Sequence, residues 1–186
     1  RAAARHQPNQ LEASDSRPVG QTFSHYRIIE KLGEGGMGVV WKALDTTLDR
    51  EVALKLLPDT FASDREKLAR LESEAKTIAS LNHPHIVTLY SIEEAEGRRF
   101  LTMELVAGRT LGEVIPPDGL SFEGLMGIAV PVAEAVSAAH RRGVVHRDLK
   151  ASNVFLVDPP SGLPLVKLVD FGVARREGRS EVLTLP

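Results

Sequence analysis

The sequence contains no cysteine among its 186 residues. This absence excludes disulfides and thiolate metal sites, and it suits a protein of the reducing cytoplasm. An excess of charge of one sign is also missing, because 23 lysines and arginines stand against 25 aspartates and glutamates, for a net charge of −2. Nucleic acid and anionic membrane surfaces, which attract strongly basic proteins, are therefore not indicated as partners.

Long apolar runs are scarce as well. The longest, 125–139, is too short to cross a bilayer and contains Glu134, so we expect no membrane segment in this stretch. The chain shows no signal peptide and opens on Arg1 rather than methionine, so we expect further sequence before it. The remaining composition, 42% hydrophobic and 26% charged, is ordinary for a soluble globular protein with one core or two small lobes.

The first residues, 1–22, mix Ala, Arg, Gln, Pro, Ser and Asp without an apolar period. Such a segment cannot bury enough apolar surface to fold, so it is predicted to be a disordered linker. The folded part is expected to begin near Phe23.

Residues able to do chemistry gather late in the chain. The run 146–153 reads H-R-D-L-K-A-S-N, and D-F-G follows at 170–172. One carboxylate can accept the proton of a hydroxyl, a carboxylate and an amide can hold a metal ion, and a lysine can offset charge on a phosphate. Asp148, Lys150, Asn153 and Asp170 therefore suit phosphoryl transfer from a nucleotide to a hydroxyl group.

A glycine-rich stretch, G-E-G-G-M-G at 33–38, lies between a predicted strand at 26–32 and a second at 39–43. Dinucleotide-binding folds use the same glycine spacing, but there the turn must open a helix. Val39, Val40 and Trp41 favour a strand instead. We therefore expect a hairpin whose glycines let the backbone approach phosphates.

A third strand is predicted over 51–57. Period-two alternation places Ala53 and Lys55 on one face, opposite Val52, Leu54 and Leu56. A small residue and a lysine on one surface suit a nucleotide, with Ala53 against the base and Lys55 at the phosphates.

A helix is predicted from Ser63, which has capping-box spacing to Glu66, to about Leu81. Glu74 projects from its apolar stripe and needs a cationic partner, for which Lys55 is the natural candidate. Two further strands are expected at 89–92 and 99–104. A long helix then follows over 121–142, ended by Gly143.

H-R-D-L-K-x-x-N and D-F-G are the catalytic-loop and metal-binding motifs of protein kinases, which this chain resembles from about Tyr26 to its last residue. G-E-G-G-M-G, L-x-H-P-x-I-V and M-E-L-V-x-G-x-T-L are most similar to the bacterial, eukaryotic-like serine/threonine kinases. The resemblance implies an α+β, two-lobed kinase fold. Its small lobe, 23–104, is an antiparallel sheet plus helix C, and 105–186 is an incomplete, mainly helical large lobe ending in the activation segment.

The resemblance also implies the site residues. Asp148 is the catalytic base, Lys150 faces the transferred phosphate, Lys55 pairs with Glu74, and Asn153 and Asp170 bind metal. The implied nucleotide contacts are Leu32, Gly33, Gly35, Gly36, Gly38, Val40, Ala53, Lys55, Met103, Glu104, Val106 and Phe155.

The implied cofactors are ATP and Mg²⁺, with Mn²⁺ as an alternative metal. The implied partners are proteins with Ser or Thr and a second kinase molecule for autophosphorylation. A phosphate on Thr184 or Ser180 would be held by Arg147. A cytoplasmic location is implied, and a membrane anchor beyond residue 186 is left open.

Three functions compete. The leading one is a protein serine/threonine kinase, indicated by a complete set of catalytic residues. The second is a catalytically incompetent ATP-binding fragment or pseudokinase-like regulatory module. The third, a small-molecule kinase of the aminoglycoside type, is disfavoured by H-R-D-L-K and by the loop containing Met37. We expect the 186 residues alone to lack transfer activity, because catalysis depends on precise positioning.

Overall fold

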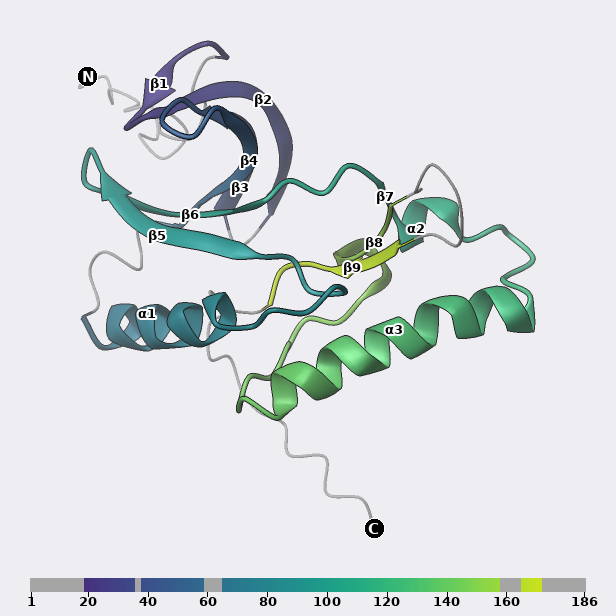
Figure 1. Ribbon diagram of the computed structural model, residues 1–186. Coiled ribbons are helices and arrows are strands. Elements are labelled where there is room, and N and C mark those ends of the chain that lie inside the picture. Colours follow the sequence, from purple (N-terminus) through teal and green to yellow (C-terminus); the bar gives the residue numbers. More distant parts are fainter. Residues whose placement is uncertain (1–18, 36–37, 59–64, 158–164, 172–186) are drawn as a thin grey trace, which may run out of the picture.

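The computed structural model describes residues 19–35, 38–58, 65–157 and 165–171. Six antiparallel strands form a curled sheet in the order β1-β2-β3-β4-β6-β5 (Figure 1). They are β1 (Thr22–Phe23), β2 (Tyr26–Gly35), β3 (Gly38–Asp45), β4 (Arg50–Leu56), β5 (Leu89–Ala95) and β6 (Arg98–Glu104). The five strands predicted between 26 and 104 are confirmed, whereas β1 was not predicted.

The start of the sheet overlaps the predicted linker. Gly20 donates its N–H to the carbonyl of Ile28 at 2.9 Å, and the N–H of Ile28 donates to the carbonyl of Gln21 at 2.9 Å. Thr22 then pairs with Arg27 in the ladder between β1 and β2. The last residues of the 1–22 segment thus belong to the fold, while 1–18 lie outside the described residues.

The alternation predicted for the third strand is confirmed in β4. Val52, Leu54 and Leu56 belong to one buried cluster on one face of the curled sheet. The other members of that cluster are Phe23, Tyr26, Ile28, Val39, Trp41, Ala43 and Phe100. Ala53 and Lys55 face the other way, and both are nonetheless buried, at 7% and 5% exposure. That second face is where the sheet meets the rest of the chain.

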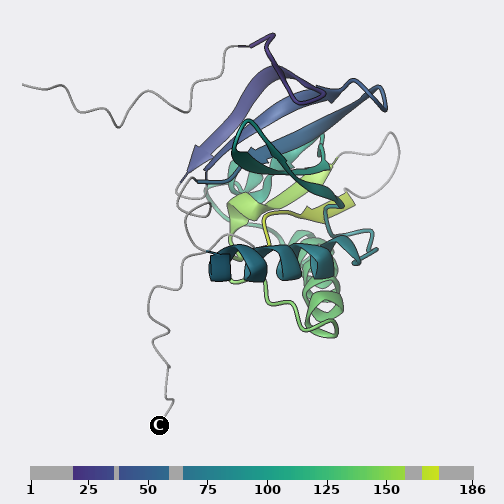
Figure 2. The same cartoon turned by 90° about the vertical axis from the view of Figure 1, so that its left-hand side faces the viewer.

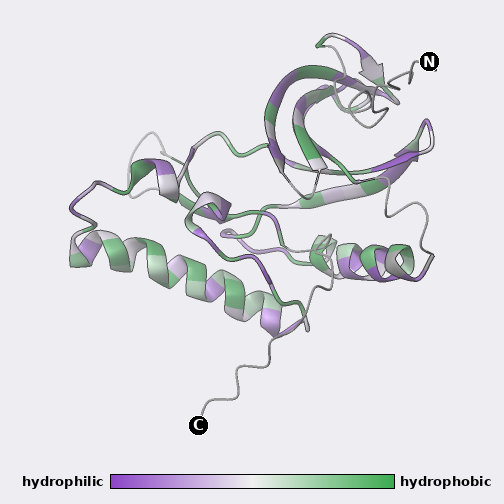
Figure 3. Cartoon of the chain, turned by 180° about the vertical axis from the view of Figure 1, so that it is seen from behind, coloured by the Kyte–Doolittle hydropathy of each residue, from purple (hydrophilic) through white to green (hydrophobic). Residues whose placement is uncertain are grey.

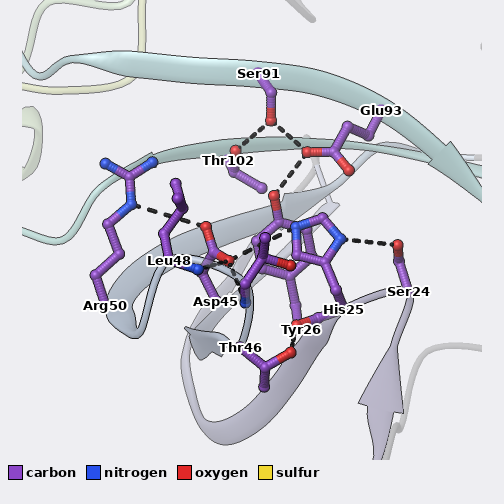
Figure 4. A network of polar contacts seen from close by, with 11 residues as sticks. Ser24, His25, Tyr26, Asp45, Thr46, Leu48, Arg50, Ser91, Glu93 and Thr102 are labelled. Atoms are coloured by element: carbon purple, nitrogen blue, oxygen red, sulfur yellow. Dashed lines mark hydrogen bonds and ion pairs between the residues drawn. The ribbon is translucent and has the colours of Figure 1, made fainter.

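Polar side chains make a network of contacts where β2 begins and β3 ends (Figure 4). The hydroxyl of Tyr26 donates to Glu93 at 2.7 Å, and Ser91 bonds both Glu93 and the buried Thr102. Burial, with the bond to Glu93, raises the pKa of Tyr26 to about 12, so this hydroxyl stays protonated and donating. The buried carboxylate of Asp45 accepts two backbone N–H groups of the turn that follows it, each at 3.0 Å. The bonds of Tyr26 and Ser91 thus join β2, β5 and β6, while those of Asp45 fix the turn after β3.

The first helix, α1 (Arg65–Ala79), lies on the side of the curled sheet away from β1 (Figures 1 and 2). Its stripe Leu71, Ala75 and Ile78 is buried, as predicted, while Leu68 is half-buried. The proposed capping residue Ser63 lies outside the described residues. The buried stripe joins a second core cluster that also includes residues of β5, β6, α3, β8 and β9. One apolar core therefore runs from the curled sheet into the second half of the chain.

The described part of the second half contains a small sheet and three helical pieces. The sheet has the order β7-β8-β9, built from β7 (Arg109–Thr110), β8 (Val154–Val157) and β9 (Leu165–Leu168). The helical pieces are α2 (Leu111–Val114), α3 (Phe122–His140) and the 3₁₀ turn η2 (Ala151–Asn153). The predicted long helix is confirmed as α3, capped by the side chain of Ser121, which accepts the N–H of Gly124 at 3.1 Å.

Among the described residues, α3 is the single helix long and apolar enough to span a membrane by length and composition. This helix is weak evidence for a membrane span, in a stretch where the sequence led us to expect none. Ile128, Ala135 and Ala139 bury one side of α3 in the core, where it packs against β9. Val132 and Val136 are partly buried against the same core. The described residues leave Phe122 and Leu125 exposed, at 79% and 49%, on a helix that Figure 3 shows as largely hydrophobic.

Gly38 begins β3 at a point where no side chain fits. Its φ is +105°, and a Cβ built there would lie 2.0 Å from the carbonyl oxygen of Leu56. Left-handed backbone and close approach both require glycine. Gly33, on the other strand of the same hairpin and paired with Val40, has nothing within 4 Å of a Cβ.

Gly38→Ala is predicted to destabilise the full-length protein by about 1–3 kcal/mol or more, from backbone strain and the clash with Leu56. Gly33→Ala, the matched control, should change the free energy of unfolding by much less. Urea unfolding of both variants measures this. Equal effects of the two substitutions would show that the approach to Leu56 does not constrain the hairpin.

Candidate active site

The buried ammonium of Lys55 is paired with the carboxylate of Asp170. Lys55 comes from β4 in the curled sheet, and Asp170 follows β9 in the small sheet, 115 residues later. The side chains are 6% and 32% exposed, so the lysine is nearly out of water and the carboxylate is partly in it. A buried cation needs such a counter-charge, and the pair holds the two halves of the chain together at this point.

A cavity of about 30 Å³ adjoins this pair. Its lining includes Lys55, Asp170 and Met103, which resemblance identifies as the residue at the back of the nucleotide pocket. Apolar residues complete the lining: Ile78, Val87, Leu89, Leu101 and Phe171. The space is enough for about one or two water molecules.

Asp148 lies within a cluster of polar contacts from the catalytic loop. The amide nitrogen of Asn153 donates to the backbone carbonyl of Asp148 at 2.8 Å and to its carboxylate at 3.2 Å. Lys150 Nζ lies 3.0 Å from the same carboxylate. The turn η2 brings Asn153 back to Asp148, with the Asn153 N–H donating to the carbonyl of Lys150 at 2.9 Å. Three of the predicted site residues are thus brought together.

His146 joins this loop to the segment before Asp170, a role that the sequence reasoning missed. The ring accepts the Asp148 N–H at Nδ1, 3.3 Å away, and Nε2 lies 3.0 Å from the carbonyl of Val169. Burial lowers the pKa of His146 below its ordinary value, which favours a neutral ring that donates from Nε2. The ring also packs on Phe171, with centroids 4.6 Å apart. The available signal was a histidine that directly follows an apolar pair and stands two residues before Asp148.

Two non-glycine residues of the site have left-handed backbone. Arg147 and Asp170 both have φ of 61°. Such conformations cost on the order of 1–3 kcal/mol and persist where surrounding structure enforces them. They occur here at the residue before Asp148 and at the acid paired with Lys55, as expected where side chains are aimed for function.

The predicted Lys55–Glu74 ion pair is wrong for this structure. Glu74 instead accepts from Arg147 at 2.9 Å, and Lys55 is paired with Asp170. At about 100° per residue, Glu74 lies at the edge of the stripe defined by Leu71 and Ile78 rather than at its centre. From that edge it borders a second cavity, of about 220 Å³, beside Arg147. Asp170 is the acid that reaches the lysine.

The expected nucleotide contacts lie mostly on one surface of the hairpin and sheet. Val40 is directly opposite Lys55, and Ala53 is opposite Met103. Gly33 pairs with Val40 and Gly35 with Gly38 across the hairpin, Leu32 is 47% exposed, and Phe155, Glu104 and Val106 are half-buried. Gly36, Met37, Gly172, Ser180 and Thr184 lie outside the described residues.

Oxygen donors at the site fit a hard divalent cation. The amide nitrogen of Asn153 is turned to Asp148, which leaves its carbonyl oxygen for another partner, and Asp170 offers a carboxylate. Across the described ranges no cluster of three or more His, Cys, Asp or Glu could hold a metal unaided. Mg²⁺ commonly binds through one or two side chains plus substrate phosphates, which matches this donor set.

Comparison with known proteins gives a consistent result. Residues 26–184 match the family described as protein kinase domain. Serine/threonine-protein kinase pkn3 of Myxococcus xanthus is 41% identical over 161 residues, which cover 84% of this chain and 29% of that protein. Serine/threonine-protein kinase PknA of Mycobacterium tuberculosis is 41% identical over 164 residues, covering 84% of this chain and 37% of the relative.

Comparison with solved structures also finds kinase domains. The crystal structure of the PknI kinase domain of Mycobacterium tuberculosis superposes with a TM-score of 0.74 at 32% identity, over 86% of this chain and 64% of that one. The two-lobed kinase fold expected from the sequence is thereby confirmed, with the large lobe incomplete. The chain spans 29% and 37% of the two curated relatives and less than two thirds of the PknI domain.

The partner of Glu74 can be tested by double-mutant cycles on the unfolding free energy of the full-length protein. Glu74→Gln and Arg147→Gln are predicted to couple by about 0.2–1 kcal/mol at low salt, because the pair is half exposed. The coupling should shrink at high salt. Glu74→Gln with Lys55→Met is the control cycle and should show none. A larger coupling of Glu74 to Lys55 than to Arg147 would contradict the observed pairing.

Proposed function

The chain belongs to the protein kinase family, and from this premise we propose that the full-length protein is an ATP-dependent serine/threonine kinase of bacterial signalling. It transfers the γ-phosphoryl group of ATP to serine or threonine hydroxyls of other proteins. Kinases of this family use ATP and a divalent metal in general. The observation that carries the proposal is the contact set around Asp148, which joins a carboxylate, an amide and a lysine within 3.2 Å.

Asp148 is the proton acceptor in this proposal. As the substrate hydroxyl oxygen bonds to the γ-phosphorus, its proton passes to the Asp148 carboxylate, and the bond from that phosphorus to the β-phosphate oxygen breaks to release ADP. Asn153 holds the carboxylate in place through its amide nitrogen. Lys150, 3.0 Å from the same carboxylate, supplies positive charge beside the transferred group.

In this proposal the phosphates of ATP are bound by Lys55 directly and by Asp170 and Asn153 through a metal ion. Lys55 lies on the same face of β4 as Ala53 and lines the cavity beside Asp170. From there its charge would suit the α- and β-phosphates. Asp170 and Asn153 would hold Mg²⁺, or Mn²⁺ in its place, through oxygen atoms. When bound, the metal neutralises charge on the phosphates and so lowers the barrier to transfer.

The adenine ring is proposed to lie between the hairpin and the small sheet. Leu32, Val40 and Ala53 would cover it from the curled sheet, and Phe155 would support it from β8. The carbonyl of Glu104 and the N–H of Val106 would bond its edge. Glu104 ends β6, so we also propose that the two lobes, 23–104 and 105–186, divide there. A cytoplasmic location follows from the supply of ATP.

Asp148→Asn in the full-length protein is predicted to lower kcat for phosphorylation of a generic protein substrate about a hundred- to ten-thousandfold. ATP affinity should stay near wild type, because Asp148 acts on the hydroxyl. Asp118→Asn, at an exposed acid between α2 and α3, controls for the lost charge. Radiolabelled ATP and calorimetry give the two readouts. Near-normal turnover would refute the role of Asp148, and a wild-type protein that binds ATP without transfer would favour a regulatory module.

A further inference from the structure

An ion pair joins the end of the curled sheet to the small sheet. Lys167 Nζ, on β9, lies 2.8 Å from Oε1 and 3.0 Å from Oε2 of Glu104, the last residue of β6. The lysine side chain is 13% exposed and the glutamate side chain 27%. A pair this far out of water is held more firmly than one on the open surface, because its charges are less screened.

The same glutamate is tied to the segment before β5. Thr88 donates its N–H to Glu104 Oε2 at 3.1 Å, and the N–H of Glu104 donates to the carbonyl of Thr88 at 2.9 Å. Both the side chain and the backbone of Glu104 therefore have fixed partners. They hold the end of β6 in one orientation.

Backbone bonds complete a closed ring of contacts. Leu168, next to Lys167, accepts the N–H of Val87 at 3.0 Å and donates its own N–H to His85 at 2.8 Å. The path from Glu104 to Thr88, through Val87 to Leu168 and back through Lys167, returns to its start. Figure 1 shows β9 lying between the curled sheet and α3, where this ring is formed. Such a ring resists rotation of one sheet against the other.

The ring borders the proposed nucleotide site at both ends. At one end is Glu104, whose carbonyl is proposed to bond adenine. At the other is β9, which leads within three residues from Lys167 to Asp170. Lys167 is also directly opposite Phe155 in the β8–β9 ladder, so the lysine lies on the sheet face proposed to support the base.

We propose that Lys167 and the Glu104 side chain are positioning residues for the nucleotide. They set the adenine edge and the metal-binding Asp170 at the separation that one ATP molecule spans. The inference rests on the proposed function, since it assigns a role in binding ATP. It adds two side chains that the motifs do not identify, because the expected part of Glu104 is its backbone carbonyl.

The test is a double-mutant cycle on Mg·ATP affinity in the full-length protein. Lys167→Met and Glu104→Gln should each raise the Kd roughly three- to tenfold, and the double variant should lose little more than either single variant. Lys167→Arg, which keeps the charge, should restore most of the affinity. In turnover assays the loss should appear in KM for ATP more than in kcat.

Lys42 and Glu51 provide the matched control. They form an ion pair of the same residue types at 3.0 Å within the curled sheet, away from β9. Lys42→Met and Glu51→Gln should leave the Kd for Mg·ATP unchanged. Unchanged affinity in the Lys167 and Glu104 variants, additive losses, or equal losses in the control pair would overturn the inference. A wild-type protein that binds no Mg·ATP would instead overturn the proposed function, and this inference with it.

Discussion

The contact between Lys55 and Asp170 is the constraint on which the arrangement of this chain depends. The Lys55 side chain is 6% exposed, so its ammonium group must have a counter-charge, and the acid paired with it comes from a segment 115 residues away. The curled sheet holds Lys55 on its inner face through the ladder with β3 and β6. On the other side, Asp170 is presented by left-handed backbone just after β9. Both halves of the chain must therefore fold correctly before the charges meet.

The rest of the site is organised around the segment that carries Asp170. Val169 donates its N–H to the carbonyl of Asn153, and its own carbonyl lies 3.0 Å from the ring of His146. The loop that carries Asp148 is thus bonded to the residue that precedes Asp170. A shift of β9 would move Asp170, His146 and Asn153 together. This common attachment explains how short, irregular segments can present reactive groups in fixed positions.

Much of this was predictable from the sequence, and the failures have identifiable causes. Alternation assigned Ala53 and Lys55 to one face because a strand has period two. Helical period placed Glu74 near a buried stripe but could not choose its partner, because the edge of a helix reaches several neighbours. The contact of Lys167 with Glu104 could not be predicted, because in the sequence a single lysine in a short strand looks the same as a solvent-exposed lysine. The strand at Thr22 and Phe23 was also missed, although the fold was expected to begin near Phe23, because a two-residue strand has no period and depends on its partner β2.

The central claim is that Asp170 and Asn153 form, beside Lys55, a metal site for a bound nucleotide. Calorimetric titration of the full-length protein with ATP, with and without Mg²⁺, tests it most directly. The account predicts that Mg²⁺ raises the ATP affinity of the wild-type protein and of Asp118→Asn, and that this enhancement disappears in Asp170→Asn. An Asp170→Asn protein in which Mg²⁺ enhances ATP binding as strongly as in wild type would contradict the account.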